Sequence, residues 1–265
     1  MKNILVTGAC GGMGRATVKM LAKQGFRVFA LDLKACEQAE NVIFIQADVT
    51  DEASIESAFE QVKTYTNELF AIVHFAGIYM LDSLVEMKTE AYDRIFDINV
   101  KGVYLLNKVF LPLLKDGSRI LITTSELAAI DPLPFTGIYA ITKAALDKYA
   151  YSLAMELQLL GIKVSVLRAG AVQTDMLGAS TAALDRFCEQ TKLYECNAKR
   201  FKAIVERVEA RCVPPERLAK KASRILEKRK PAFAYKINRN PLLLLMNILP
   251  KRMQLWAIRM ILRQK

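Results

Sequence analysis

The chain has 265 residues, and 52% of them are hydrophobic, which is enough for one large α/β domain with a sizeable core. Its five cysteines are odd in number and include no Cys-x-x-Cys pair, which argues against a disulfide framework or a zinc site and fits a reducing, cytoplasmic setting. The net charge of +11 is concentrated at one end: residues 216–265 hold 14 basic and two acidic residues, and the rest of the chain is close to neutral. This asymmetry predicts an anionic partner surface near the carboxyl terminus.

The sequence predicts no signal peptide, no membrane-spanning helix and no metal site. The amino terminus enters a predicted strand at once, so no signal peptide is expected. No run of 18 apolar residues occurs, so no membrane-spanning helix is expected. His74 is the only histidine, and it lies inside the apolar run 70–75. We interpret it as a packed strand residue, and no metal site is predicted.

A nucleotide-binding pattern opens the chain. Asn3–Thr7 is a short apolar run that predicts a buried strand, a glycine-rich loop follows from Gly8 to Gly14, and residues 15–23 have helical spacing. Glycines allow a tight turn and close approach of a pyrophosphate, which then rests on the helix amino terminus. Strand, glycine loop and helix together predict a dinucleotide site.

The second predicted strand, residues 27–31, ends at Asp32. A carboxylate about 20 residues after the glycine loop can accept hydrogen bonds from the adenosine ribose and repels a 2′-phosphate. NAD(H) is therefore the expected cofactor, although the nearby Lys34 leaves NADP(H) open.

Strands and helices then alternate along the chain. Long helices are expected over residues 89–114 and 138–160, and Thr50 or Asp51 can cap a helix over residues 52–65. This alternation predicts a Rossmann-like, doubly wound parallel sheet of seven strands. The remaining strands are expected at 42–45, 69–75, 119–125, 163–167 and 231–235.

Two segments lie outside the alternating pattern. Residues 175–213 contain a helical stretch without a strand, which we interpret as a lid over the ligand edge of the sheet. The Rossmann domain is expected over residues 1–240, with a helix that starts at Pro214-Pro215, and the tail over residues 241–265.

The tail is basic and amphipathic. It has an aliphatic run before Pro250, a narrow arginine stripe after it, and Trp256. Such a segment can lie on an anionic membrane surface, form a dimer contact, or cap a channel for a lipophilic substrate. Nucleic acid is not expected, because leucines stand where phosphate binding uses polar residues.

Tyr139 and Lys143 are four residues apart in a predicted helix, so they share one face. A lysine ammonium beside a phenol favours the phenolate and lowers the tyrosine pKa, which suits proton transfer to a carbonyl oxygen. Ser125 ends the fifth predicted strand, at the edge where α/β sheets bind ligands.

These motifs occur together in one order. Residues 3–235 resemble the short-chain dehydrogenase/reductase (SDR) family in its ordinary short form. The motifs are Thr7-Gly8-x-x-x-Gly12-x-Gly14, Asp48, Ala76-Gly77, Asn99, Ser125, Tyr139-x-x-x-Lys143 and Arg168-x-Gly170-x-x-x-Thr174.

The resemblance implies a role for each matching residue. Tyr139 would be the general acid/base, Ser125 would stabilise the substrate oxygen, and Lys143 would lower the tyrosine pKa and hold the ribose. Asn99 would support a proton-relay water. The cofactor would be bound by Gly8, Gly12, Met13, Gly14, Asp32, Asp48, Val49, Ala76, Gly77, Tyr139, Lys143 and Thr174.

The chain also departs from the family pattern. The family's Asn-Asn-Ala-Gly is here His74-Phe75-Ala76-Gly77, and its Pro-Gly after the sixth strand is Ala169-Gly170. The step from Ser125 to Tyr139 is one residue longer than is common, which makes Thr124 an alternative for the serine role. The loop also fits the glycine spacing of the longer epimerase-like members, whose large carboxyl-terminal domain has no room here.

The resemblance implies an enzyme, an NAD(H)-dependent oxidoreductase that interconverts a secondary alcohol and a ketone. The tail and its aliphatic run favour a lipophilic substrate of the steroid, retinoid or long-chain carbonyl class. A homo-oligomer, a dimer or a tetramer, is expected, and contact with a membrane surface would be peripheral. The alternative hypothesis is a cofactor-binding protein that senses redox state or acts as a scaffold without turnover.

Overall fold

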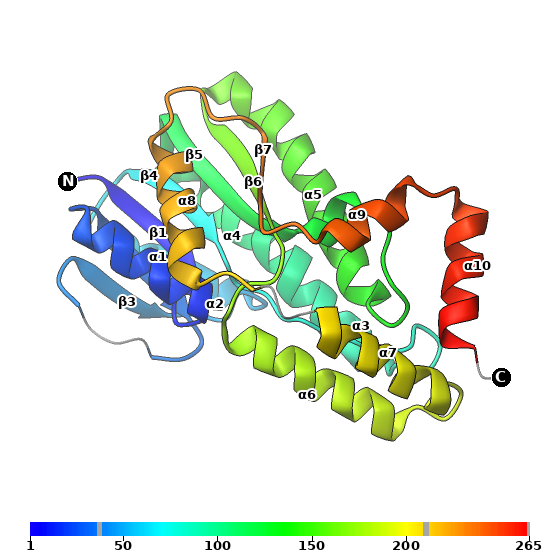
Figure 1. The fold of residues 1–265 in the computed structure, drawn as a ribbon. Helices are drawn as coiled ribbons and strands as arrows, with labels where there is room; N and C mark the ends of the chain where they lie inside the picture. Colours follow the sequence, from blue (N-terminus) through cyan, green and yellow to red (C-terminus); the bar gives the residue numbers. More distant parts are fainter. Residues whose placement is uncertain (36–38, 209–211, 264–265) are drawn as a thin grey trace.

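The computed structural model describes residues 1–35, 39–208 and 212–263. At its centre lies a seven-stranded sheet in the order β3-β2-β1-β4-β5-β6-β7, and all six neighbouring pairs are parallel (Figure 1). The predicted doubly wound sheet is therefore confirmed. Its strands are β1 (Asn3–Thr7), β2 (Arg27–Asp32), β3 (Val42–Gln46), β4 (Leu69–His74), β5 (Leu114–Ser125), β6 (Lys163–Ala169) and β7 (Ala234–Ile237).

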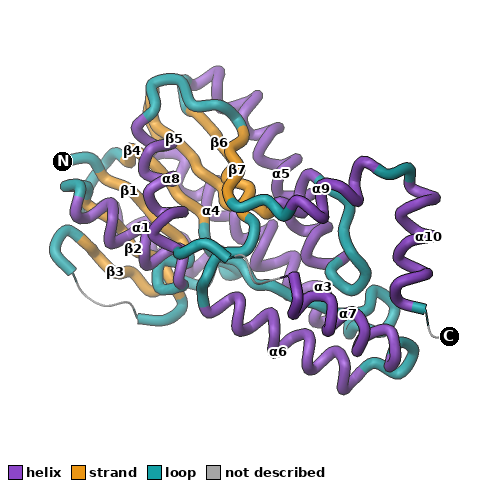
Figure 2. Tube along the Cα trace, viewed as in Figure 1, coloured by secondary structure: helices purple, strands orange, loops and turns teal. Residues whose placement is uncertain are grey.

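Helices cover both faces of the sheet (Figure 2). On one face, Ile4 and Val6 of β1 pack with α1 (Gly12–Lys23) and α8 (Pro215–Glu227). On the other face, Leu5 packs with a cluster that includes α2 (Glu52–Lys63), α4 (Gly102–Phe110) and α5 (Gly137–Leu157). Successive strand residues point to opposite faces, so a sheet covered on both sides needs continuous apolar strands, and the sequence supplies them.

Local chemistry sets where several helices begin and end. Asp51 is the N-cap of α2, and its carboxylate accepts a hydrogen bond from the Ala53 amide at 3.1 Å. Pro215 occupies the first turn of α8, where its missing N–H has no helical partner to lose. Gly161, with φ of +72°, ends the short 3-10 turn that follows α5.

The helix predicted over residues 89–114 is interrupted. α3 (Thr89–Phe96) runs into a π-helical turn at Asp97–Lys101, α4 follows, and a 3-10 turn at Leu111–Leu113 ends the segment. Pro112 explains the end, since proline cannot donate the next helical hydrogen bond. The π-turn contains Asn99, and single π-turns within helices often occur at functional sites.

Two strand boundaries also differ from the prediction. β5 begins at Leu114, because the Ser118 hydroxyl donates to the Leu69 carbonyl at 2.8 Å and replaces a ladder bond where the register shifts. β7 covers Ala234–Ile237, three residues later than predicted at its start. Pro231 has no N–H to give to the sheet, which explains the later start.

The lid and the tail lie on the side of the molecule where the strands end (Figure 1). The lid consists of α6 (Asp175–Gln190) and α7 (Glu195–Val208), which pack against each other, and the tail consists of α9 (Pro241–Ile248) and α10 (Lys251–Leu262). Among the described residues, no helix combines the length and the apolar character that a bilayer crossing requires.

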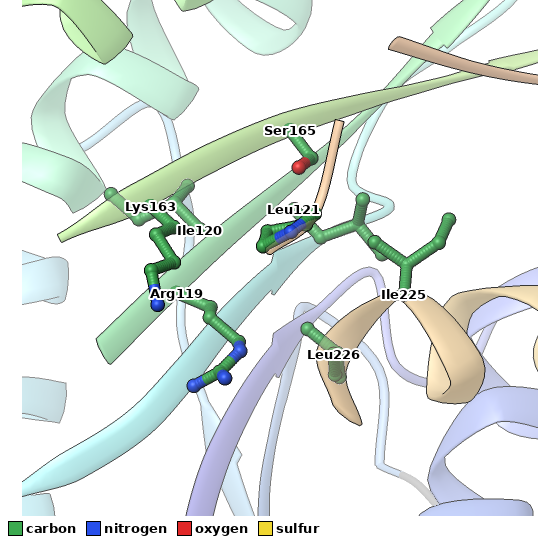
Figure 3. Close-up of a pocket in the computed structure, with 8 residues that line it drawn as sticks. Arg119, Ile120, Leu121, Lys163, Ser165, Ile225 and Leu226 are labelled. Carbon is green, nitrogen blue, oxygen red and sulfur yellow. The ribbon is translucent and has the colours of Figure 1, made fainter. Parts of the chain in front are cut away.

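A recess at the opposite end of the sheet has no room for a ligand. Figure 3 shows this recess, where side chains of β5 and β6 meet Ile225 and Leu226 of α8. Its interior volume is about 0 Å³, so it has no room for a water molecule. Arg119 lies there, six residues before Ser125 on the same strand.

His74 is packed inside the sheet. Its side chain is buried at the end of β4, and its Nε2 lies 3.0 Å from Oδ1 of Asn107 on α4. The Asn107 amide donates in turn to the Tyr149 hydroxyl at 3.2 Å. Burial lowers the pKa of His74 from 6.5 to about 4, so the imidazole is neutral at physiological pH.

Stability is expected to fall as the pH drops from 6.5 toward 4. The unfolded chain takes up the imidazole proton near pH 6.5, whereas the folded chain resists it down to about pH 4. The full effect is about 3 kcal/mol in the free energy of unfolding. Denaturant titrations across this range should show a smaller decrease for His74→Gln, which carries no titrating imidazole. Equal pH dependence of the two proteins would contradict the assignment.

Candidate active site

The glycine loop joins β1 to α1 in a conformation that only glycine allows. Gly8 has φ of +62°, and a Cβ there would lie 2.6 Å from the Ala76 amide nitrogen. A Cβ on Gly14 would lie 2.0 Å from the Gly8 carbonyl oxygen. The loop therefore has a tight turn and a bare backbone surface, as close approach of a ligand requires.

The loop opens toward the start of α6 and the amino end of α1. A Cβ on Gly12 would lie 2.7 Å from the Thr174 side chain, and Thr174 is the N-cap residue of α6. The first turn of α1, where Met13 lies, has no acidic residue. Free amides and the helix dipole favour an anion there, so the residues present fit the pyrophosphate of a dinucleotide.

Asp32 lies beside this loop at the end of β2. Its carboxylate accepts hydrogen bonds from the Cys10 amide at 2.9 Å and the Lys34 amide at 3.2 Å. Those contacts fix the carboxylate next to the glycine loop. Cys10 is disulfide-bonded in the structure.

Asp48 and Val49 follow β3. One Asp48 carboxylate oxygen accepts from both the amide and the hydroxyl of Thr50, at 2.8 and 2.7 Å. Val49 packs against α4, where a Cβ on Gly102 would lie 3.0 Å from the Val49 carbonyl oxygen. Asp48 thus shapes the turn through its side chain, and its backbone amide donates to the Ser54 hydroxyl at 2.9 Å.

Tyr139 and Ser125 meet at the carboxyl end of β5. Their hydroxyls are hydrogen-bonded to each other, and the Tyr79 ring lies 4.9 Å from the Tyr139 ring, centroid to centroid. Burial raises the pKa of Tyr139 above its ordinary value, with a further rise from Tyr79, while the Ser125 hydrogen bond opposes both. The lowering by Lys143 that the sequence predicted is not found in the chain alone, where burial and Tyr79 raise the pKa of Tyr139.

Lys143 lies one helical turn after Tyr139, with its ammonium 5.6 Å from the centre of the tyrosine ring. Burial lowers its pKa from 10.5 to about 8, since no acidic partner offsets the loss of water. The Lys143 Nζ and the Asn99 Oδ1 lie 3.3 and 3.1 Å from the point where a Cβ on Gly77 would be. Because Gly77 has no side chain, the Lys143 ammonium and the Asn99 amide can both lie against its backbone.

Asn99 is fully buried and held by the backbone on both sides. Its Oδ1 accepts from the Ile78 amide at 2.8 Å, and its Nδ2 donates to the Ile78 carbonyl at 3.0 Å. The same Nδ2 lies 3.1 Å from the Thr142 hydroxyl oxygen on α5. The π-turn thus ties the loop after β4 to the helix that carries Tyr139 and Lys143.

The position of Thr124 separates it from the serine role. Its hydroxyl donates to Asp147 at 3.3 Å, and Asp147 forms a bidentate ion pair with Arg168 of β6 at 2.9 and 2.6 Å. Thr124 is therefore engaged with Asp147, two helical turns after Tyr139 on α5, whereas the Ser125 hydroxyl meets Tyr139 itself. The geometry favours Ser125 over the alternative that the sequence left open.

Tyr79, Thr142 and Asp147 were missed by the sequence analysis, and Arg168 was named there only as part of a motif, without a role. Asp147 follows Lys143 by four residues and Tyr139 by eight, so helical spacing alone places it on the same stripe of α5. Tyr79, in contrast, lies in a loop, and no periodic signal marks it.

The space in front of Tyr139 is filled by an apolar cluster of the lid. Tyr79 and Phe135 pack against this lid cluster, and the Phe135 ring lies 4.5 Å from the Phe187 ring. The buried members are Leu81, Ala183, Leu184, Phe187, Ala198, Phe201 and Leu262. Leu262 belongs to α10, so the tail forms part of this cover.

The tail is attached to the loop between Ser125 and Tyr139. The Asp131 amide donates to the Asn247 side chain at 2.6 Å, and the Asp131 carboxylate pairs with Lys251 and accepts from Gln254. At the lid, Asn197 donates to the Leu262 carbonyl at 2.6 Å. These contacts matter for the three interpretations of the tail, namely a membrane contact, a dimer contact or a cap over a substrate channel. They hold the tail against the lid cluster near Tyr139.

Known proteins of similar sequence are oxidoreductases. A 3-ketodihydrosphingosine reductase of Bacteroides thetaiotaomicron is 26% identical over 235 residues, which cover 88% of this chain and 87% of that enzyme. Estradiol 17-beta-dehydrogenase 2 of Mus musculus is 34% identical over 194 residues, 67% of this chain and 50% of that enzyme. This chain thus matches only half the length of the steroid enzyme.

Solved structures share the fold. A short chain dehydrogenase family protein of Francisella tularensis has a TM-score of 0.75 at 24% identity, covering 89% of this chain and 97% of that one. A 3-ketoacyl-(acyl-carrier-protein) reductase of Brucella melitensis, complexed with NADH, has a TM-score of 0.73 at 24% identity, with 89% and 96% covered. The family model of the short chain dehydrogenases matches residues 2–185. The chain is a member of the short-chain dehydrogenase/reductase family.

Proposed function

We propose that this oxidoreductase interconverts a secondary alcohol and a ketone with NAD(H), on a lipophilic substrate. The observation that carries the proposal is the Ser125–Tyr139 hydroxyl pair, which lies beside Lys143 at the same sheet edge as the glycine loop. The cofactor supplies or accepts the hydride when it is bound. The chain's own residues then have to orient the substrate oxygen and move its proton.

Each polar group has one task in this proposal. In the reduction, the Tyr139 hydroxyl donates its proton to the carbonyl oxygen, while the Ser125 hydroxyl donates a hydrogen bond to the same oxygen. The Lys143 ammonium favours the tyrosinate that remains and binds the ribose, and Asn99 holds a water that returns the proton. The glycine loop with Met13, Asp32, Asp48, Val49, Ala76, Gly77 and Thr174 holds the cofactor.

A lipophilic substrate is supported by what lies in front of Tyr139. The lid cluster presents aromatic and aliphatic side chains there, and its contact with Tyr139 runs through Tyr79. Two of the similar enzymes are named for a sphingoid ketone and a steroid. Steroids, retinoids and long-chain carbonyls are therefore the classes to examine first.

The experiment is a screen of steroid, retinoid and long-chain alcohols and ketones, followed by NADH absorbance. Substrate-dependent formation or consumption of NADH is the expected result. Tight NADH binding without turnover of any class would instead favour a redox-sensing or scaffold protein.

NAD(H) is expected to be the better cofactor. The Asp32 carboxylate is fixed beside the loop and would repel a 2′-phosphate. In the unmodified protein, kcat/KM should be higher with NAD than with NADP, and Asp32→Ala should narrow the ratio. Asp51→Ala, a capping change away from the loop, is the control and should leave the ratio unchanged. Equal efficiency with NADP in the unmodified protein would overturn the expectation.

We also propose that the tail contacts an anionic membrane surface and that residues 1–240 form the catalytic body. The outer face of α10 exposes Leu255, Trp256 and Met260 next to Arg252.

A homo-oligomer is supported by exposed apolar side chains on the outer face of α5, such as Tyr151 and Met155.

The membrane contact has a direct reporter, because Trp256 is the only tryptophan and 64% of it is exposed. Its emission is expected to shift to the blue with phosphatidylglycerol vesicles but not with phosphatidylcholine vesicles. High salt should reverse the shift, since it screens the arginines. An unchanged emission with the anionic vesicles would contradict this contact.

A further inference from the structure

A cleft lies beside the lid cluster, between the tail and the loop that joins Ser125 to Tyr139. Its volume is about 540 Å³, within the range of about 300–1,000 Å³ typical of small-molecule sites. Its walls come from four segments distant in sequence: the loop at Ser83–Val85, the loop at Pro134–Phe135, the start of α7 with the preceding Tyr194, and the end of α10 with Arg263. Most of its lining side chains are apolar.

One wall of this cleft is shared with the cover of the active site. Phe135 lines the cleft and packs on Phe187 and Phe201 of the lid, with ring centres 4.5 and 5.5 Å away. Its φ of +66° is rare for a bulky residue and indicates local strain. Phe135 therefore belongs both to the cleft wall and to the lid cluster, and this cluster reaches Tyr139 through Tyr79.

The cleft also carries unneutralised positive charge. Arg259 and Arg263 of the tail line it, and both side chains are exposed. Neither guanidinium forms an ion pair with any residue in the described parts of the chain. An apolar cavity with two free guanidinium groups is complementary to an apolar chain with an anionic end.

Nearby carboxylates do not cancel this charge, because each has other partners. Glu86 accepts from the Thr191 hydroxyl and from the amides of Lys192 and Leu193. Asp131 pairs with Lys251 and accepts from Gln254. The same contacts hold α10 in place, so the cleft is built by the folded chain rather than by a free tail.

We propose that this cleft binds an amphiphile whose alkyl chain lies against the apolar walls and whose carboxylate or phosphate pairs with Arg259 and Arg263. The inference goes beyond the proposed function, because it adds a ligand site next to the lid cluster whose lining does not include Ser125, Tyr139 or Lys143. Arg259 and Arg263 lie beyond residues 2–185, the range of the family match.

Calorimetric titration of the full-length chain with dodecyl phosphate below its micelle concentration tests the site without any turnover. Dodecyl phosphate is expected to bind, and dodecanol, with the same chain and no charge, is expected to bind more weakly. The double variant Arg259→Gln, Arg263→Gln should lose about tenfold or more in affinity, as expected for charge-assisted hydrogen bonds. Arg252→Gln is the matched control, since it lies on the same helix, is exposed and does not line the cleft.

A second pair of variants tests the apolar wall. Val85→Asp places a carboxylate at an exposed position in the cleft lining and should weaken dodecyl phosphate binding, whereas Leu159→Asp, at an exposed position in the turn after α5 and outside the cleft lining, should not. Equal affinities of the arginine double variant and the Arg252→Gln control would overturn the proposal. Failure of dodecyl phosphate to bind while the enzyme still reduces a neutral lipophilic ketone would overturn this inference and leave the proposed function intact.

Discussion

Tyr139→Phe is expected to lower turnover by about 100-fold or more, because it removes the proton donor and keeps the ring. The hydroxyl that is lost contacts Ser125 and lies apart from the glycine loop, so NADH binding should stay close to that of the unmodified protein. The measurement is kcat with any substrate found in the screen, together with NADH affinity by fluorescence titration.

Tyr92→Phe is the matched control for this change. It removes the hydroxyl of a tyrosine that is 44% exposed on α3 and has no part in the proposed proton transfer. Retention of most activity in Tyr139→Phe would defeat the mechanism. Ser125→Ala should also be strongly impaired in kcat, whereas a greater loss of kcat in Thr124→Ala would mean that the serine role is assigned to the wrong residue.

Asp147→Ala is expected to lower the free energy of unfolding by about 3 kcal/mol, because it leaves Arg168 without its bidentate partner. Only 18% of the Arg168 side chain and 12% of the Asp147 side chain are exposed, so water replaces little of the lost interaction. Thr124 loses its acceptor in the same change. Urea denaturation of the two proteins measures the difference.

Glu52→Ala gives the comparison for this pair. Glu52 pairs with Lys108 at 2.7 Å, but those side chains are 43% and 54% exposed. An ion pair of this kind contributes about 1 kcal/mol or less. If both substitutions cost the same, burial of the Asp147–Arg168 pair has no role in its strength.

Much of the fold could be read from apolar runs. β1, β2 and β4 are short stretches of apolar residues between turn signals, and their residues pack on both faces of the sheet. The interruptions could not be read in this way. The π-turn around Asn99 depends on hydrogen bonds to Ile78 and Thr142, which are distant in sequence. The bulge in β5 likewise depends on Ser118 reaching Leu69.

In the candidate site too, features set by local spacing could be predicted, and features set by contacts distant in sequence could not. Spacing alone brought Tyr139 and Lys143 to one helix face, and strand ends brought Ser125 and the glycine loop to one edge. Spacing could not decide between Thr124 and Ser125, because that choice depends on Asp147 across the sheet. It also gave the wrong direction for the Tyr139 pKa, since charge proximity can be read from sequence and burial by a distant lid cannot.

The attachment of the tail to Asp131 has a mechanical consequence. Asp131 lies inside the loop that separates Ser125 from Tyr139, and three side chains of the tail, Asn247, Lys251 and Gln254, bond to it. The two hydroxyls at the centre of the site are thus braced from two directions, by the sheet beneath and by the last helices of the chain above. A displacement of α10 would therefore move the loop that joins Ser125 to Tyr139. The end of the sequence and the middle of the site are coupled through Asp131.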